Sequence, residues 1–201
     1  MNNYHTLINN HFISIKSEIL KKQCEENEML TNQMVKKLND QLNLEFYSSN
    51  LYLQMSAWCD DQNFPSFGKF LRDHASEERQ HMERLFDYVL DCGALALIGK
   101  IEAPESEYKS LLDVFKAAYQ HELKITKEIN ELVDYALTQK DFSTFHFLQW
   151  YVAEQHEEEK LFKSIVDKLE LVGENKRDLF FMDKDFNKTL SESGLLASSA
   201  E

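Results

Sequence analysis

Helix breakers are scarce in this sequence, which has five glycines and two prolines in 201 residues. Most of them cluster at a few points, around Pro65 and Gly68, between Gly93 and Pro104, and at Gly173. The stretches between these points are therefore predicted to be helical. This leaves no segment for which we expect a strand.

Cysteine, basic residues and long apolar runs are also sparse. Cys24, Cys59 and Cys92 are widely spaced and form no Cys-x-x-Cys pair, which fits a reducing compartment and leaves no thiolate metal site. The formal net charge of −13 argues against a nucleic-acid partner and favours cations or simple solubility. No apolar run is long enough for a membrane span, and the first residues lack the apolar core of a signal peptide. We therefore expect a cytoplasmic protein that binds neither nucleic acid nor membranes.

The breakers divide the chain into four long helices and a shorter fifth one. The long helices are predicted from Thr31 to about Cys59, from an N-cap at Ser66 to Gly93, from about 108 to 138, and from Asp141 to about 172. Two of the links are short and must join antiparallel neighbours, whereas residues 93–107 can span the length of a bundle. We therefore expect an all-α fold, a ferritin-like four-helix bundle with one long crossover and a short fifth C-terminal helix.

Each predicted long helix carries a 3-4-3-4 stripe that faces a bundle core, and each stripe contains one glutamate among mainly apolar residues. These glutamates are Glu45, Glu78, Glu122 and Glu158. Each lies near the middle of its helix, so all four should meet at one height. Buried carboxylates that repel one another must be protonated, solvated in a cavity or bound to metal. Glu78 and His81 form Glu-x-x-His, and the whole set is typical of a di-iron site.

Four motifs, in this order, resemble those of the bacterial non-haem ferritins: LNLEFYSSNLYLQMSAW, FLRDHASEERQHMERLFDY, YQHELKIT and FLQWYVAEQHEEEKLFKSI. The similarity covers about residues 31–190. It implies a ferroxidase, an enzyme that oxidises Fe(II) with dioxygen or hydrogen peroxide. It also implies iron storage, with ferric oxyhydroxide mineral held inside a hollow homo-oligomer of 24 subunits.

Carried over residue by residue, the resemblance implies where the irons bind. One iron of the ferroxidase centre falls to Glu45, Glu78 and His81, with Glu78 bridging, and the second falls to Glu122 and Glu158, near Gln155. A third iron position is implied by the acidic residues Glu77, Glu154, Glu157 and Glu158. Tyr52 is expected beside the irons, where it would supply an electron.

Haem is not expected. A bacterioferritin would carry a second Glu-x-x-His and a Met directly after the Glu78 position, but this chain has Gln155 with Glu158, and Arg79 follows Glu78. A rubrerythrin-like peroxidase would need a Cys-x-x-Cys domain. His74 also lies on a stripe, but we expect a core histidine that is hydrogen-bonded to a neighbour. The other histidines of the four long helices, His121, His146 and His156, fall off the inward stripes.

Two other functions remain open: a ferritin-fold protein that mainly consumes peroxide, and a helical scaffold with structural duties. Residues 1–30 have no counterpart in the resemblance, and Met29 stands where the chains of that family begin. They are either absent from the native protein or a real extension, and apolar residues from Ile8 to Ile19 could form one face of an extra helix. Residues 191–201 are predicted to be a disordered tail.

Overall fold

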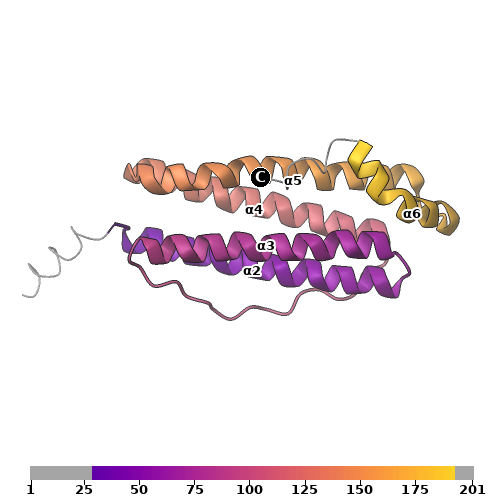
Figure 1. The fold of residues 1–201 in the computed structure, drawn as a ribbon, viewed down its shortest axis with the longest axis horizontal. Coiled ribbons are helices and arrows are strands. Elements are labelled where there is room, and N and C mark those ends of the chain that lie inside the picture. The colour runs from indigo at the N-terminus through magenta and orange to yellow at the C-terminus, as the bar shows by residue number, and fades with distance from the viewer. Residues whose placement is uncertain (1–28, 193–201) are drawn as a thin grey trace, which may run out of the picture.

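A computed structural model describes residues 29–192 and confirms the all-α fold (Figure 1). The five helices in this range are α2 (Asn32–Asp61), α3 (Pro65–Asp91), α4 (Leu111–Gln139), α5 (Phe142–Val172) and α6 (Lys176–Glu192). Helices α2 and α3 form one antiparallel hairpin, and α4 and α5 form the other. The crossover between the hairpins runs along the whole bundle, so that α4 is parallel to α3. Helix α6 packs against α3 and α5 at one end of the bundle.

The predicted extension and tail lie largely outside the described residues. Leu30, the last residue of the predicted extension, is already buried in the core. None of the helices within residues 29–192 is both long and apolar enough to cross a membrane.

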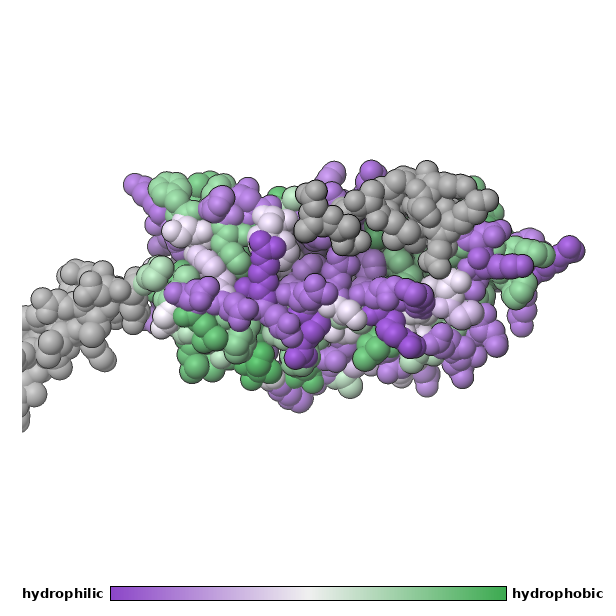
Figure 2. All heavy atoms as spheres, in the orientation of Figure 1, coloured by the Kyte–Doolittle hydropathy of each residue, from purple (hydrophilic) through white to green (hydrophobic). Residues whose placement is uncertain are grey.

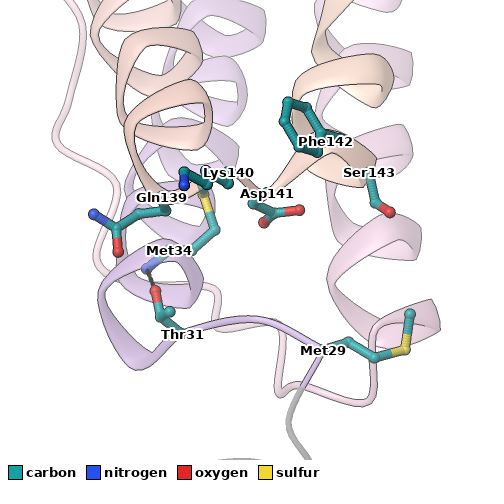
Figure 3. A pocket seen from close by; sticks show the side chains of 8 residues that line it. All are labelled: Met29, Thr31, Met34, Gln139, Lys140, Asp141, Phe142 and Ser143. Carbon is teal, nitrogen blue, oxygen red and sulfur yellow. Dashed lines mark hydrogen bonds between the residues drawn. The ribbon is translucent and has the colours of Figure 1, made fainter.

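Side-chain caps define three of the helix starts. Thr31, Ser110 and Asp141 each accept a hydrogen bond from the backbone N–H three residues later, at 3.1, 3.1 and 3.0 Å. Figure 3 shows the first of these caps at the end of the bundle, where Thr31 lies near the α4–α5 turn. The hollow that these segments line is far along the helices from the buried glutamates. It therefore plays no part in the candidate site.

The start of α3 differs from the prediction, because Ser66 is not its N-cap. Phe64 precedes the helix without a side-chain cap, and Pro65 occupies the first turn. The N–H groups of Ser66 and Phe67 donate instead to Oδ1 of Asp183 on α6, at 2.9 and 3.1 Å. This acceptor lies more than a hundred residues away in the sequence, so no local pattern could indicate it.

Replacing Asp183 by Ala should lower the free energy of unfolding by about 1–2 kcal/mol, as for other lost N-caps. The carboxylate is only 5% exposed and satisfies two N–H groups that would otherwise be buried without a partner. Urea unfolding would measure the change. The exposed Glu174 provides the control, since Glu174→Ala should change stability by less than about 0.5 kcal/mol. Equal unfolding midpoints for the two variants would contradict the capping role.

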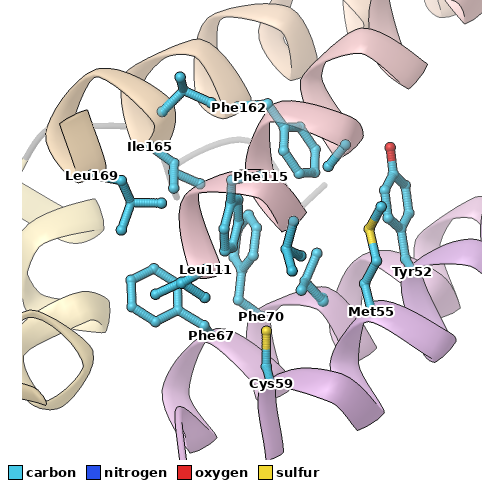
Figure 4. Close-up of a cluster of buried hydrophobic side chains, with 14 of the residues drawn as sticks. Tyr52, Met55, Cys59, Phe67, Phe70, Leu111, Phe115, Phe162, Ile165 and Leu169 are labelled. Carbon is cyan, nitrogen blue, oxygen red and sulfur yellow. The ribbon is translucent and has the colours of Figure 1, made fainter. Parts of the chain in front are cut away.

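The inward stripes are confirmed, and they divide the core into two apolar clusters. One cluster lies beside α6 and is rich in aromatic rings (Figure 4). Phe67 stands at its centre, with ring centroids 5.2 Å from Phe115 and 4.0 Å from Phe186. The other cluster is mostly aliphatic and fills the opposite end, around Leu38, Leu85 and other residues. The polar residues of the stripes lie between these clusters, at mid-height in the bundle.

Two asparagines of α2 hold the crossover against the bundle. Asn39 bonds to the backbone of Leu95 and Leu97, and Asn43 bonds to the backbone of Leu97 and Gly99, at 2.7–3.1 Å. The crossover therefore follows a fixed path but leaves apolar side chains in solvent. Leu95, Leu97 and Ile98 are 68%, 54% and 49% exposed, and Figure 2 shows apolar atoms gathered on this side of the molecule.

Candidate metal centre

The four stripe glutamates are buried, and each comes from a different helix. Glu45 on α2 and Glu122 on α4 are fully buried, while Glu78 on α3 and Glu158 on α5 are 3% and 6% exposed. Each lies near the middle of its helix, as the sequence predicts. Carboxylates are rarely buried without a charge partner. Their neighbours therefore decide what this site can hold.

Ligand atoms of Glu45, Glu78 and His81 all lie within 4.8 Å of one another. Gln41 donates a hydrogen bond to Oε1 of Glu45, whereas Oε2 of Glu45 is buried and has no hydrogen-bond partner among the described residues. Nδ1 of His81 lies 3.3 Å from Oε2 of Glu78. A buried carboxylate oxygen without a donor is costly unless a cation reaches it. This half of the site therefore has the shape and chemistry of a metal position.

Glu122 is held by two donors instead. The Tyr52 hydroxyl donates to Oε1, and the Gln155 amide donates to Oε2 at 3.0 Å. Tyr52 in turn stacks on Phe162, with ring centroids 5.6 Å apart. Glu122 belongs to none of the groups of three possible ligands found among the described residues. The structure thus places Tyr52 and Gln155 beside the site, and each oxygen of Glu122 keeps a second lone pair available to a metal.

The predicted third position lies on the face between α3 and α5. Here no Cα atom of α3 comes within 8 Å of one in α5, but their side chains meet, since Nε2 of His74 lies 3.2 Å from Oε2 of Glu158. The half-buried Glu77 belongs to one group of possible ligands with His81 and Glu154 and to another with His74 and Glu158. Glu157, by contrast, is exposed and belongs to neither group.

Burial and mutual repulsion raise the pKa values of these carboxyl groups. Burial is the larger cause for Glu78, whose pKa lies well above its usual range, followed by the charges of Glu45 and Glu122. Burial and the charge of Glu158 raise the pKa of Glu122 to about 8, although its hydrogen-bond donors oppose the shift. The pKa of Glu154 is raised by burial and by Glu77. Protons therefore neutralise much of the metal-free site, and a divalent cation would displace them.

The metal-free protein should lose stability as the pH rises from about 5 to 8. The pKa of Glu122 is about 8 in the folded protein against an ordinary value of 4.5, so the folded state binds the extra proton and its advantage disappears as that proton leaves. Thermal unfolding midpoints across this range would measure the slope. Glu122→Gln removes this ionisation and should make the slope shallower, whereas identical slopes for the two proteins would contradict this origin.

Some residues near the site were not predicted from the sequence, or were predicted to lie elsewhere on their helix. His121 was predicted off the inward stripe, but it is buried and its Nε2 lies 2.8 Å from the Ser48 hydroxyl. Burial and Lys124 lower its pKa to about 4. Tyr151 and Trp150 stack on each other beside His81, and each has a buried polar atom without a partner among the described residues.

A four-helix bundle with one long crossover, a glutamate from each helix and a Glu-x-x-His pair at its centre defines the class of ferritin-like carboxylate proteins. Sequence comparison agrees with this class, since a family model for the ferritin-like domain matches residues 35–172. The chain belongs to the ferritin family.

Curated relatives cover the same part of the chain. A probable bacterial non-heme ferritin-like protein of Haemophilus influenzae is 61% identical over 157 residues, which are 78% of this chain and 95% of that protein. A bacterial non-heme ferritin of Escherichia coli is 55% identical over 159 residues, 79% of this chain and 96% of the relative.

Solved structures give the same result. An open pore ferritin from the archaeon Archaeoglobus fulgidus superposes with a TM-score of 0.77 at 44% identity, covering 79% of this chain and 96% of that one. The ferritin of Chlorobium tepidum reaches a TM-score of 0.71 at 51% identity, over 80% and 99% of the two chains.

Proposed function

We propose that this protein is an iron-storage ferritin that oxidises Fe(II) at a dinuclear ferroxidase centre. The observation that carries the proposal is the buried cluster of Glu45, Glu78 and His81, in which one carboxylate oxygen has no hydrogen-bond partner among the described residues. A divalent cation at this point would satisfy that oxygen and neutralise the like charges that burial brings together.

The first ferrous ion binds to Glu45, Glu78 and His81, and the second to Glu122 and Glu158 near Gln155, with Glu78 bridging. Carboxylate ligands favour Fe(III) over Fe(II) and so promote the loss of an electron from each ion. Two ferrous ions then supply the two electrons that reduce dioxygen, with two protons, to hydrogen peroxide. With peroxide as the oxidant, two electrons and two protons give two waters. Ferric ions leave the site, hydrolyse and release protons as the mineral grows.

A third ion binds near Glu77, Glu154, Glu157 and Glu158, on the face between α3 and α5. The closeness of Glu77 to Glu154, whose possible ligand atoms lie within 4.8 Å of each other, and the raised pKa of Glu154 support this position. Tyr52, whose hydroxyl is bonded to Glu122, is placed to supply an extra electron to the dinuclear site. Burial and the charge of Glu122 raise the pKa of this phenol well above its usual range, so that it keeps its proton until it is oxidised.

Storage requires a hollow assembly, which we propose to be a homo-oligomer of 24 subunits in the cytoplasm. The exposed apolar side chains along the crossover are surface that a second copy of the chain would cover. The net charge of −13 would attract ferrous ions to the shell. No haem takes part in this function.

Iron loading of the purified protein tests the proposal. A large hollow particle should form from metal-free protein, and its sedimentation rate should increase when Fe(II) and air are added, because mineral accumulates inside. The visible spectrum should show no Soret band at any stage. A monomer or dimer at micromolar concentration, or iron that precipitates outside the particle, would contradict storage.

A further inference from the structure

Tyr151 on α5 has a buried hydroxyl that is not hydrogen-bonded. The side chain is fully buried, and its hydroxyl oxygen has no hydrogen-bond partner among residues 29–192. A buried tyrosine usually finds a partner for its O–H, and the exceptions include groups with a redox or catalytic role. The centroid of the Tyr151 ring lies 5.4 Å from that of His81. The phenol therefore lies beside the first of the two proposed iron positions.

Glu45, another ligand proposed for the first iron, acts on this phenol by its charge. Burial is the largest cause that raises the pKa of Tyr151 well above its usual range, and the charge of Glu45 is the next. The phenol therefore keeps its proton at neutral pH. Each carboxylate oxygen has two lone pairs, so Glu45 can bind a cation and still accept a proton from an oxidised phenol. Tyr52 has a similar place at the other half of the site, where its hydroxyl donates to Glu122.

Trp150 separates Tyr151 from the solvent and is a poor electron donor. The two rings stack, with centroids 4.4 Å apart and planes 4° apart, and Trp150 is half-buried. The Arg84 guanidinium lies 3.9 Å from the centroid of the Trp150 ring, and its positive charge disfavours a tryptophan radical cation. The buried Nε1–H of Trp150 has no acceptor in the described part of the chain, so the ring cannot readily lose its proton either. An oxidised Tyr151 would therefore not recover its electron from Trp150.

We propose that Tyr151 is a second electron donor of the ferroxidase site, which serves the first iron position as Tyr52 serves the second. The inference rests on the proposed function, because it requires Fe(II) bound by Glu45 and His81. Hydrogen peroxide takes up two electrons to form two waters, whereas a site that holds a single Fe(II) supplies only one. Tyr151 supplies the other electron, so that no hydroxyl radical is released.

The step is balanced in electrons and protons. The O–H bond of Tyr151 breaks, its electron goes to the peroxide, and its proton reaches the same oxidant by way of Glu45. With one further proton from water, hydrogen peroxide becomes two waters, Fe(II) becomes Fe(III) and Tyr151 becomes a neutral tyrosyl radical. The next ferrous ion returns the electron, a proton from water restores the phenol, and that ion leaves as Fe(III).

Freeze-quench electron paramagnetic resonance tests the proposal. Metal-free assembled protein is mixed with one Fe(II) per subunit and then with hydrogen peroxide. Tyr52→Phe should still give a tyrosyl radical signal, and Tyr52→Phe combined with Tyr151→Phe should lose it. Phenylalanine keeps the stacked ring and removes only a hydroxyl without a partner among the described residues, so the double variant should fold. Tyr52→Phe combined with Tyr135→Phe is the control and should keep the signal, because Tyr135 is 13 residues from Glu122 on α4, about 20 Å along the helix.

The role of Arg84 gives a second measurement. Arg84→Gln in the Tyr52→Phe protein removes the positive charge over Trp150, so part of the radical signal should become that of a tryptophan. Should the variant that lacks both phenols not assemble, this spectrum decides the matter. A tryptophan component places the radical at the stack of Tyr151 and Trp150, and an unchanged tyrosyl spectrum places it elsewhere.

The outcomes separate this inference from the proposed function. If the unaltered protein does not oxidise Fe(II) rapidly, the ferroxidase centre itself is wrong. If the Tyr52→Phe protein is assembled and oxidises Fe(II) rapidly but gives no tyrosyl signal, Tyr151 is a packing residue and the inference fails. A tyrosyl signal that persists in the assembled variant without Tyr52 and Tyr151 would also overturn it.

Discussion

Replacing Glu78 or His81 by Ala should abolish rapid Fe(II) oxidation while the subunit still folds and assembles. Both side chains belong to the buried ligand group, and Glu78 is expected to bridge the two irons. Loss of a residue that only supports a ligand typically reduces metal affinity or activity 10- to 100-fold, so loss of a ligand itself should cost roughly 100-fold or more. Glu78→Ala should still fold, because removing a buried carboxylate relieves repulsion from Glu45 and Glu122 and offsets the lost packing.

Initial oxidation rates of the variants and the unaltered protein, followed by the absorbance of ferric iron, would measure this effect. His146→Ala is the control, because His146 is an exposed histidine of the neighbouring helix α5 and its replacement should leave the rate unchanged. Size-exclusion chromatography would show that each variant is assembled. An assembled Glu78→Ala or His81→Ala protein with the normal initial rate would show that oxidation occurs elsewhere.

Glu158→Gln should slow the fast oxidation and weaken binding of the third ion. The double change of Glu154 and Glu157 to Gln should leave the rate of the fast phase unchanged. Glu158 lies between the proposed dinuclear site and the α3–α5 face. Its charge raises the pKa of Glu122. An oxygen of its carboxylate also lies within 4.8 Å of possible ligand atoms of His74 and Glu77. Its loss should slow oxidation roughly 100-fold or more, as for the other ligands. The double variant removes only acids of the outer face, so the two irons should still bind and react.

The initial rate of oxidation and the number of ions bound per subunit together distinguish these variants. The double variant should keep the initial rate but show a changed ratio of iron oxidised per dioxygen and slower recovery of the site between additions of iron. Glu159→Gln is a control of the same chemistry on the same helix, and it should match the unaltered protein. Three ions in crystals of the double variant, at the occupancy seen without the changes, would refute the role of these two acids.

The arrangement of the fold and of the buried glutamates could be predicted because both depend on periodicity. A stripe with a 3.6-residue period must face the core, and the side chains at Leu38, Leu85, Ile129 and Leu148 are buried as that rule requires. A glutamate in such a stripe is conspicuous because burial of a charge is costly. Similar helix lengths, of 27 to 31 residues, then place the four glutamates at one height without any knowledge of the tertiary contacts.

Contacts between distant segments could not be predicted in this way. The cap that Asp183 provides for α3 depends on where α6 packs against the bundle. Ser66 was predicted as the N-cap because a serine just before an apolar stretch is a common local pattern. His121 lies outside the stripe but is buried with Ser48 as its partner. His74 is buried, whereas Glu157 is exposed. This difference depends on the distance between α3 and α5, which cannot be predicted from the pattern of one helix.

In the proposed function, two ferrous ions are oxidised together inside each subunit before the mineral grows. Stopped-flow mixing of metal-free protein with increasing amounts of Fe(II), with dioxygen and hydrogen peroxide compared as oxidants, tests it most directly. We expect a fast phase with either oxidant, whose amplitude saturates at two to three irons per subunit, followed by slower formation of mineral inside the particle. A much faster reaction with peroxide and little mineral would favour a protective role over storage. Oxidation that rises linearly with added iron, without a saturating fast phase and at the rate of buffer alone, would show that the subunit has no ferroxidase centre.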